Sequence, residues 1–331
     1  MRFAPDAAPD DHRSDARSRP RTLTHVFAHR SGEWDLRVEP RVVGILNLTP
    51  DSFYDGGRYG TPETALAYAE RMVEAGADAI DIGGQSTRPG GTPVPPEEEW
   101  RRIEASLSLL AARVVIPLSI DTYHAEVARR ALDAGVSIVN DVSGLEVDPS
   151  IADAAARAGA GLVVMHSLGA PADLHAPREY EDVAREIRDS LAERMSLAQS
   201  RGVSRERIAL DPGIGFSKRA DQSIEALRGI GRLLELERPI YVGLSRKSFL
   251  GALTGAPPQG RLAAGLGAAA AAYALGARVF RTHDVRETVE CVRVARALFA
   301  PAPAGAAAVG SAAASVASEP PAGSASVGVA P

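Results

Sequence analysis

The sequence predicts an α/β protein of the (β/α)8, or TIM barrel, class, built as a single domain. Two observations carry this prediction: eight short apolar segments alternate with segments of helical character, and each apolar segment ends in polar side chains. A polar side chain inside a buried parallel strand is costly, so the interiors of such strands are apolar. Polar groups just beyond the ends of eight strands indicate one shared face, which a closed barrel provides.

The eight predicted strands are short and mostly aliphatic or β-branched, as buried parallel strands are. In chain order they are Val42–Leu48, Ala79–Ile82, Ile116–Ile120, Ser137–Val139, Gly161–Met165, Ile208–Leu210, Pro239–Leu244 and Arg278–Phe280. An open doubly wound sheet would use the same repeating unit, and periodicity alone does not separate the two. Eight units within about 260 residues favour the closed barrel.

Residues typical of helix starts and helix ends stand in the segments between these strands. Thr61–Glu63 places a capping residue, a first-turn proline and an acid in the order that a helix start prefers, and Asp148–Pro149 repeats the cap and proline. Pro96 precedes Glu97–Glu99, which complement the positive end of a helix and are expected to be solvated. Glycines that can end a helix in the left-handed conformation stand just before five strands, at Gly76, Gly135, Gly159, Gly202 and Gly276.

Composition limits the classes of function. The chain has 331 residues and a net charge of −5, which gives no broad basic field for nucleic acid. Its single cysteine, Cys291, excludes an internal disulfide and fits a reducing compartment. The N-terminus lacks the apolar core of a signal peptide, and Leu262–Ala277 is too short to span a membrane. We therefore expect a cytoplasmic protein that binds neither nucleic acid nor membrane.

The patterned region is bounded by two segments with little to bury. Residues 1–21 mix charged residues with proline and serine, and residues 301–331 are almost entirely Ala, Pro, Gly, Ser and Val. Both are predicted to be disordered tails. The barrel domain is expected over residues 22–300, with residues 22–41 pairing as a short hairpin that closes the barrel floor.

Seven motifs follow the predicted strands in a fixed order, and together they resemble the dihydropteroate synthases over nearly the whole patterned region. They are NLTPDSF at 47–53, STRPG at 86–90, SIDT at 119–122, NDVSG at 140–144, DPGIGF at 211–216, SRKSFLG at 245–251 and RTHDV at 281–285. This family, the target of sulfonamides, joins p-aminobenzoate to 6-hydroxymethyl-7,8-dihydropterin diphosphate, forming dihydropteroate and pyrophosphate in folate biosynthesis.

The resemblance implies a pterin pocket, and the residue types suit one. A pterin presents a flat edge of alternating hydrogen-bond donors and acceptors, which carboxylate, amide and ammonium groups can pair with. The alternative for Asp121 and Asp211 is that they cap the helices after their strands. The pterin-binding residues implied by the family are Asp121, Asn140, Met165, Asp211 and Lys247.

The resemblance also implies sites for the leaving group and for p-aminobenzoate. Asn47, Arg88, Arg281 and His283 match the diphosphate positions, with Asn47 also contributing to Mg²⁺ binding. The alternatives are a salt bridge of Arg281 with Asp284 and a rim or capping role for His283. The p-aminobenzoate positions are Phe53, Thr87, Pro89, Phe216 and Ser248, with Phe216 stacking on the ring.

We expect no covalent intermediate and no strong general base, because the attacking aromatic amine is already neutral at pH 7. Catalysis would come from stabilising the separated charge and from loops that exclude water. Asp55, Arg88 and Lys247 are the expected catalytic residues.

Several positions depart from the family pattern without removing an expected contact residue. Gln85 stands where glutamate is common, and Ser217 replaces a common glycine after Phe216. Tyr54 and the pair Ser167–Leu168 also differ. Gln85 keeps one alternative open, a paralogue that binds pterin with little turnover. A pterin-dependent methyltransferase, which shares the barrel and the pterin pocket, is the other. The family further implies a homodimer through the seventh and eighth barrel helices, the seventh of which lies in the alanine- and glycine-rich segment 260–276.

Overall fold

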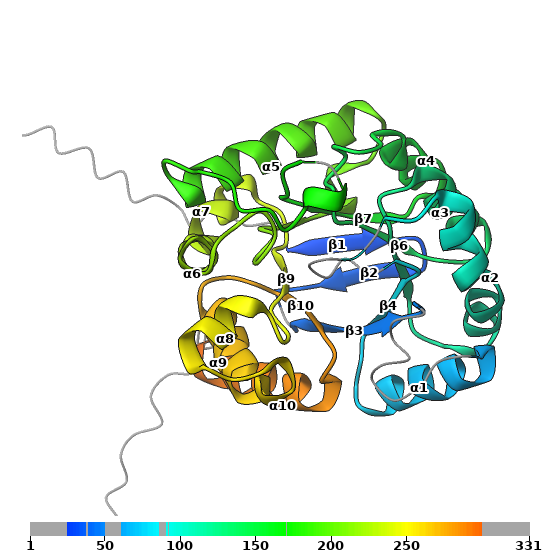
Figure 1. Cartoon of the computed structure of the whole chain (residues 1–331). Coiled ribbons are helices and arrows are strands. Elements are labelled where there is room, and N and C mark those ends of the chain that lie inside the picture. Colours follow the sequence, from blue (N-terminus) through cyan, green and yellow to red (C-terminus); the bar gives the residue numbers. More distant parts are fainter. Residues whose placement is uncertain are drawn as a thin grey trace, which may run out of the picture. The chain divides into compact units, whose positions relative to one another are not determined.

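The computed structural model describes residues 25–37, 39–49, 61–85, 91, 93–169 and 171–299, so both predicted tails lie outside the described residues. Eight parallel strands form one sheet in the order β8-β7-β6-β5-β4-β3-β10-β9. A parallel bridge between Leu210 and Ile240 joins the two outer members, β8 and β9, and closes the sheet. Helices surround this sheet (Figure 1). The predicted TIM barrel is confirmed.

All eight predicted strands are present, and no boundary differs from the prediction by more than two residues. They are β3 (Arg41–Asn47), β4 (Ala79–Gly83), β5 (Leu118–Asp121), β6 (Ile138–Asp141), β7 (Gly161–Met165), β8 (Ile208–Asp211), β9 (Tyr241–Gly243) and β10 (Val279–Thr282). The late starts of β5 and β9 have one cause. Pro117 and Pro239 accept hydrogen bonds from Ile80 and Leu210 through their carbonyls, but neither has an N–H to donate to the ladder.

The helices begin and end largely where the sequence signals stand. They are α1 (Pro62–Glu74), α2 (Pro96–Arg113), α3 (Ala125–Asp133), α4 (Ser150–Ala158), α5 (Val183–Ser200), α6 (Ala220–Arg228), α7 (Ile230–Leu233), α8 (Ser248–Thr254), α9 (Leu262–Ala274) and α10 (Val285–Phe299). Thr61 caps α1 by accepting from the Thr64 N–H at 3.3 Å. All five predicted helix-ending glycines have positive φ, between 61° and 114°.

Two apolar layers hold the barrel together. The larger lies between the strands and the helices and includes Leu46, Ile80 and Ile120. The smaller fills one end of the barrel interior, where Phe27 and Trp34 contact inward-facing strand residues.

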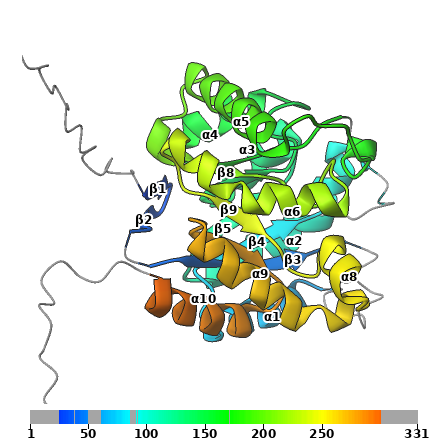
Figure 2. The ribbon, with the colours of Figure 1, turned by 90° about the vertical axis from the view of Figure 1, so that its left-hand side faces the viewer.

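Phe27 and Trp34 come from the predicted hairpin, formed by β1 (Val26–His29) and β2 (Gly32–Asp35). In Figure 2 this hairpin lies at the end of the barrel away from α8. It therefore closes the floor, as predicted, and leaves the carboxyl ends of the strands as the face for a site. Within the part of the chain that the structure describes, no helix combines the length and apolar character needed to cross a bilayer.

Candidate functional site

The strand ends bring most of the predicted site residues to one face. In the ladder Asn47 lies opposite Gly83, Gly83 opposite Asp121, and Asp121 opposite Asn140. Farther round the barrel Met165 lies opposite Asp211. Because parallel strands share their carboxyl end, this register gathers polar groups from four strands, β3, β5, β6 and β8, around one mouth.

Arg281, on β10, is the centre of the polar network on this face. Its Nε donates to Asp81 Oδ2 and its Nη2 to Asp121 Oδ2, both at 2.6 Å. Asn140 Nδ2 donates to the same Asp81 oxygen at 3.0 Å. The alternative pairing of Arg281 with Asp284 is wrong, because Asp284 Oδ1 instead accepts from Arg246 Nη2 at 2.8 Å.

The charges in this network do not cancel, since one guanidinium faces two buried carboxylates. Burial works against the charge of Arg281, but Asp81 and Asp121 outweigh it and raise its pKa, so the group stays protonated. Burial raises the pKa of Asp121 to about 7, against the opposing effect of Arg281. One oxygen of each carboxylate, Asp81 Oδ1 and Asp121 Oδ1, has no hydrogen-bond partner among the described residues. Buried polar atoms are rarely left unsatisfied, so these oxygens can accept from a ligand.

Asp211 and Lys247 form the second charged part of the site. Asp211 Oδ1 accepts from the Gly213 N–H at 2.7 Å, so the carboxylate does cap the turn after its strand. Burial raises the pKa of Asp211 to about 6, opposed by this bond and by Lys247. Burial likewise lowers the pKa of Lys247 to about 8, opposed by Asp211. Capping one turn uses one oxygen and leaves this pair able to meet a ligand.

An aromatic wall stands next to this pair. Lys247 Nζ lies 3.9 Å from the centroid of the Phe216 ring. The His175 ring stacks on Phe216, with centroids 4.6 Å apart and an interplanar angle of 26°. His175 was not among the predicted site residues, because it follows no motif. Ser248 is exposed at the start of α8.

Lys218 is a second functional-face residue that the sequence analysis missed, although it directly follows DPGIGFS. Its buried Nζ lies 3.0 Å from each of three acceptors: His166 Nδ1 and the carbonyls of Gly213 and Phe216. Burial lowers the pKa of Lys218 to about 7, opposed by Asp211. The contacts hold the loop between Asp211 and Phe216 in a single shape.

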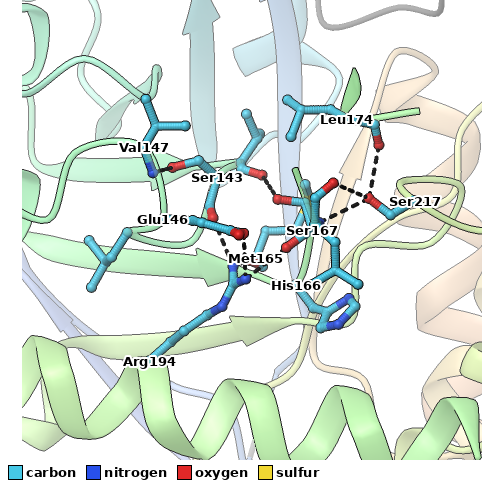
Figure 3. A network of polar contacts seen from close by, with 12 residues as sticks. Ser143, Glu146, Val147, Met165, His166, Ser167, Leu174, Arg194 and Ser217 are labelled. Carbon is cyan, nitrogen blue, oxygen red and sulfur yellow. Dashed lines mark hydrogen bonds and ion pairs between the residues drawn. The ribbon is translucent and has the colours of Figure 1, made fainter. Parts of the chain in front are cut away.

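Arg194, on α5, fixes the exits of two strands from the outside (Figure 3). Its Nη1 donates to the carbonyls of Ser143 at 2.7 Å and Met165 at 3.0 Å, and its Nη2 donates to that of Ser167 at 2.7 Å. Nη2 also pairs with Glu146. The guanidinium thereby holds the loop after β6 against the end of β7, where Met165 lies. No motif surrounds Arg194, so the sequence offered no signal for it.

His283 lies just after β10, and its contacts fit the alternative of a rim histidine while its role towards the diphosphate stays a prediction. The ring Nδ1 of His283 lies 3.1 Å from Ser245 Oγ, and its backbone N–H donates to the same oxygen at 3.4 Å. On the other side of the mouth, Asn47 Oδ1 lies close to the Cα of Gly83, within 3.4 Å of the point where a Cβ would stand. The described residues contain no group of three or more His, Cys, Asp or Glu arranged to hold a metal ion.

The first turn of α2, which follows the second loop, differs from expectation at Glu99. This side chain is 1% exposed, and its Oε2 lies 2.6 Å from His124 Nδ1, so the prediction of a solvated Glu97–Glu99 run is wrong at its last residue. The cause is helical periodicity, which turns Glu99 inward against Gly84. Beside it, the Gln85 amide donates to the Tyr123 hydroxyl.

The first and second loops carry the remaining predicted site residues. Phe53, Tyr54 and Asp55 of the first loop lie outside the described residues, as do Thr87, Arg88 and Pro89 of the second. Their roles stay predictions.

Comparison with known proteins gives one consistent result. The profile described as "Pterin binding enzyme" matches residues 43–283. A dihydropteroate synthase from Synechocystis sp. is 44% identical over 268 residues, covering 81% of this chain and 92% of the relative. The structure of Xanthomonas albilineans dihydropteroate synthase with 4-aminobenzoic acid has a TM-score of 0.74 and 42% identity, covering 80% of this chain and 95% of that one. A structure of the X. albilineans enzyme in complex with 7,8-dihydropteroate has a TM-score of 0.72 and 40% identity, covering 82% and 97%.

Proposed function

This chain belongs to the dihydropteroate synthases of the pterin-binding enzyme family, and from that premise we propose how its residues divide between the substrates. Its reaction condenses p-aminobenzoate with 6-hydroxymethyl-7,8-dihydropterin diphosphate, giving 7,8-dihydropteroate and pyrophosphate in folate biosynthesis. The relatives described above are synthases, which leaves the methyltransferase alternative without support.

The pterin edge is bound by Asp121, Asn140, Asp211 and Lys247, with Met165 against the ring. The observation that carries this assignment is the unsatisfied buried oxygen of Asp121, which requires a donor from outside the described residues. The pterin ring supplies such donors in one plane. The 7,8-dihydropteroate complex of the X. albilineans enzyme supports binding of a pterin-derived product by this fold.

The p-aminobenzoate ring lies against Phe216, with Lys247 and Ser248 beside it and Phe53, Thr87 and Pro89 contributed by the two loops. The support is the position of the Phe216 ring, which the stacked His175 imidazole holds beside the Lys247 ammonium. The X. albilineans structure with 4-aminobenzoic acid supports binding of this substrate to the shared fold.

The diphosphate is bound by Arg281, His283, Arg88 and Asn47. The residues present fit Mg²⁺ held mainly through the substrate, because Asn47 offers a single neutral oxygen at the mouth and Mg²⁺ usually retains several waters. When bound, the ion neutralises charge on the departing diphosphate. Arg281 serves the same end, since its guanidinium stays charged throughout the working pH range.

The chemistry follows from these positions. The C–O bond to the diphosphate breaks, the pterin methylene becomes electron-deficient, and the lone pair of the p-aminobenzoate nitrogen forms the new C–N bond. The amine then loses a proton to water or pyrophosphate. Lys247 and Arg281 stabilise separated charge in a partly dry site, and Asp55 and Arg88 complete the catalytic set.

Turnover is tested by measuring pyrophosphate release from the pterin diphosphate with and without p-aminobenzoate, and with and without Mg²⁺. We expect release that depends on both substrates and falls when EDTA removes the ion. Binding of the pterin without release under any of these conditions would instead support the paralogue of little turnover.

Pterin affinity is expected to fall as the pH drops through about 7 to about 6. Both Asp121 and Asp211 have raised pKa values in the free protein, so they take up protons in this range and lose acceptor capacity for the pterin edge. Below the pKa of each carboxylate, its protonation lowers the pterin affinity about tenfold per pH unit. Calorimetric titration between pH 5 and pH 8 checks this, with Asp211→Asn expected to flatten the curve. A wild-type affinity independent of pH would contradict it.

The chain forms a homodimer through α9 and α10. The support is an exposed apolar surface on these helices, where Leu262, Val294 and Leu298 are 37%, 59% and 71% exposed. Analytical ultracentrifugation at micromolar concentration should give a dimer, and Val294→Asp should shift it towards monomer because the charge would be buried. A wild-type sample that sediments only as monomer would refute the assignment.

A further inference from the structure

Ser217, the serine that stands where related sequences commonly have glycine, is the junction between two loops at the site. Its backbone has φ of +53°, in the left-handed region that disfavours residues with a side chain. The residue is completely buried. A buried non-glycine residue in this conformation persists only where its surroundings stabilise it, which makes its contacts informative.

The Ser217 hydroxyl joins the loop after β8 to the segment after β7 (Figure 3). Its Oγ accepts from the Leu168 N–H at 2.9 Å. Its proton can be donated to the carbonyl of Leu168 at 3.0 Å or to that of Leu174 at 3.2 Å. The hydroxyl therefore satisfies groups at both ends of the turn between these two leucines.

The backbone of Ser217 adds three bonds to the same segment. Its N–H donates to the Leu174 carbonyl at 2.7 Å, and its carbonyl accepts from the Arg178 N–H at 3.1 Å and from the Tyr180 hydroxyl at 3.2 Å. These backbone contacts would survive a side-chain substitution, so the hydroxyl can be tested separately from them.

The segment held in this way carries His175, the partner of the aromatic wall. Leu174 directly precedes His175. The His175 ring stacks on Phe216, which is the residue before Ser217. His175 Nδ1 also lies 3.1 Å from the Gly215 carbonyl. A shift of the segment would therefore tilt or remove the ring that backs Phe216.

We propose that the Ser217 hydroxyl is a positioning group for p-aminobenzoate: it locks the His175 segment to the DPGIGF loop and so fixes Phe216 beside Lys247. This rests on the proposed role of Phe216. Ser217 itself touches no reacting atom, so its effect is on binding of the second substrate rather than on the chemical step.

The test compares Ser217→Ala with Ser217→Gly. Both remove the hydroxyl, but only glycine also removes the cost of the left-handed backbone, so thermal stability should be lower for alanine than for glycine. If the hydroxyl positions the wall, both variants should raise KM for p-aminobenzoate by about fivefold, the effect of one lost hydrogen bond. KM for the pterin diphosphate should stay within about twofold of wild type.

Ser223→Ala is the matched control, because it removes another buried serine hydroxyl, on α6, which donates to the carbonyl of Arg219, and it should leave both KM values unchanged. An unchanged p-aminobenzoate KM in both Ser217 variants overturns the proposal, and so does a defect confined to alanine, which would report backbone strain. Phe216→Ala tests the proposed role of Phe216 separately from that of the Ser217 hydroxyl. If this variant leaves the KM for p-aminobenzoate unchanged, the role of Phe216 is wrong, whatever the Ser217 variants show.

Discussion

Arg281→Ala should lower kcat/KM by at least about tenfold, because a charged contact to the diphosphate is worth about 1.5–3 kcal/mol. It should also destabilise the fold by about 3–5 kcal/mol at neutral pH, since Asp81 and Asp121 lose the guanidinium that bonds both. Steady-state kinetics and urea unfolding measure the two effects separately.

The pH dependence of this destabilisation has a defined sign. Burial already raises the pKa of Asp121, and removing Arg281 raises it further, so the folded variant holds protons that the unfolded chain releases. Its stability should therefore continue to decrease as the pH rises above about 7, where that of the wild type has levelled off, and the difference between the two proteins should shrink on acidification. Arg278→Ala is the control, because Arg278 lies next to the other end of β10 and bonds the Tyr273 carbonyl. Near-native activity in Arg281→Ala would remove the diphosphate assignment.

Lys247→Ala should likewise lower kcat/KM by at least about tenfold. The ammonium lies over the Phe216 ring and interacts with Asp211, so its removal affects both substrate sides at once. Unlike Ser217→Ala, this variant should raise KM for both substrates. A KM change confined to one substrate would contradict the assignment of Lys247 to both substrates.

Lys247→Arg gives a sharper form of the same test. Burial lowers the pKa of Lys247 to about 8, so kcat/KM of the wild type should fall above that pH as the free protein loses this charge. Arginine stays charged, so the alkaline limb should disappear even if the activity at neutral pH is reduced. An alkaline limb of the same shape in both proteins would show that another group causes it.

The order of elements could be read from the sequence because it depends on local rules. Short apolar runs gave all eight barrel strands, and proline and glycine signals gave most helix ends. The floor hairpin followed from residues 22–41 in the same way. Boundaries were less accurate at Pro117 and Pro239, where a missing N–H delays the ladder. Family motifs then located Asp121, Asn140, Asp211, Lys247 and Arg281, whose gathering on one face the barrel topology predicts.

The tertiary structure alone decided how these groups are paired. Nothing in the sequence indicated that Arg281 bonds Asp81 rather than Asp284, or that His175 stacks on Phe216. Arg194 and Ser217 follow the same principle, since each bonds backbone atoms of a distant loop, and Lys218 bonds the distant side chain of His166. Such contacts depend on distance in space and carry no periodicity along the chain. The sequence by itself therefore determined the barrel and the chemistry at its mouth, whereas packing determined which buried charges pair and which loops are held together.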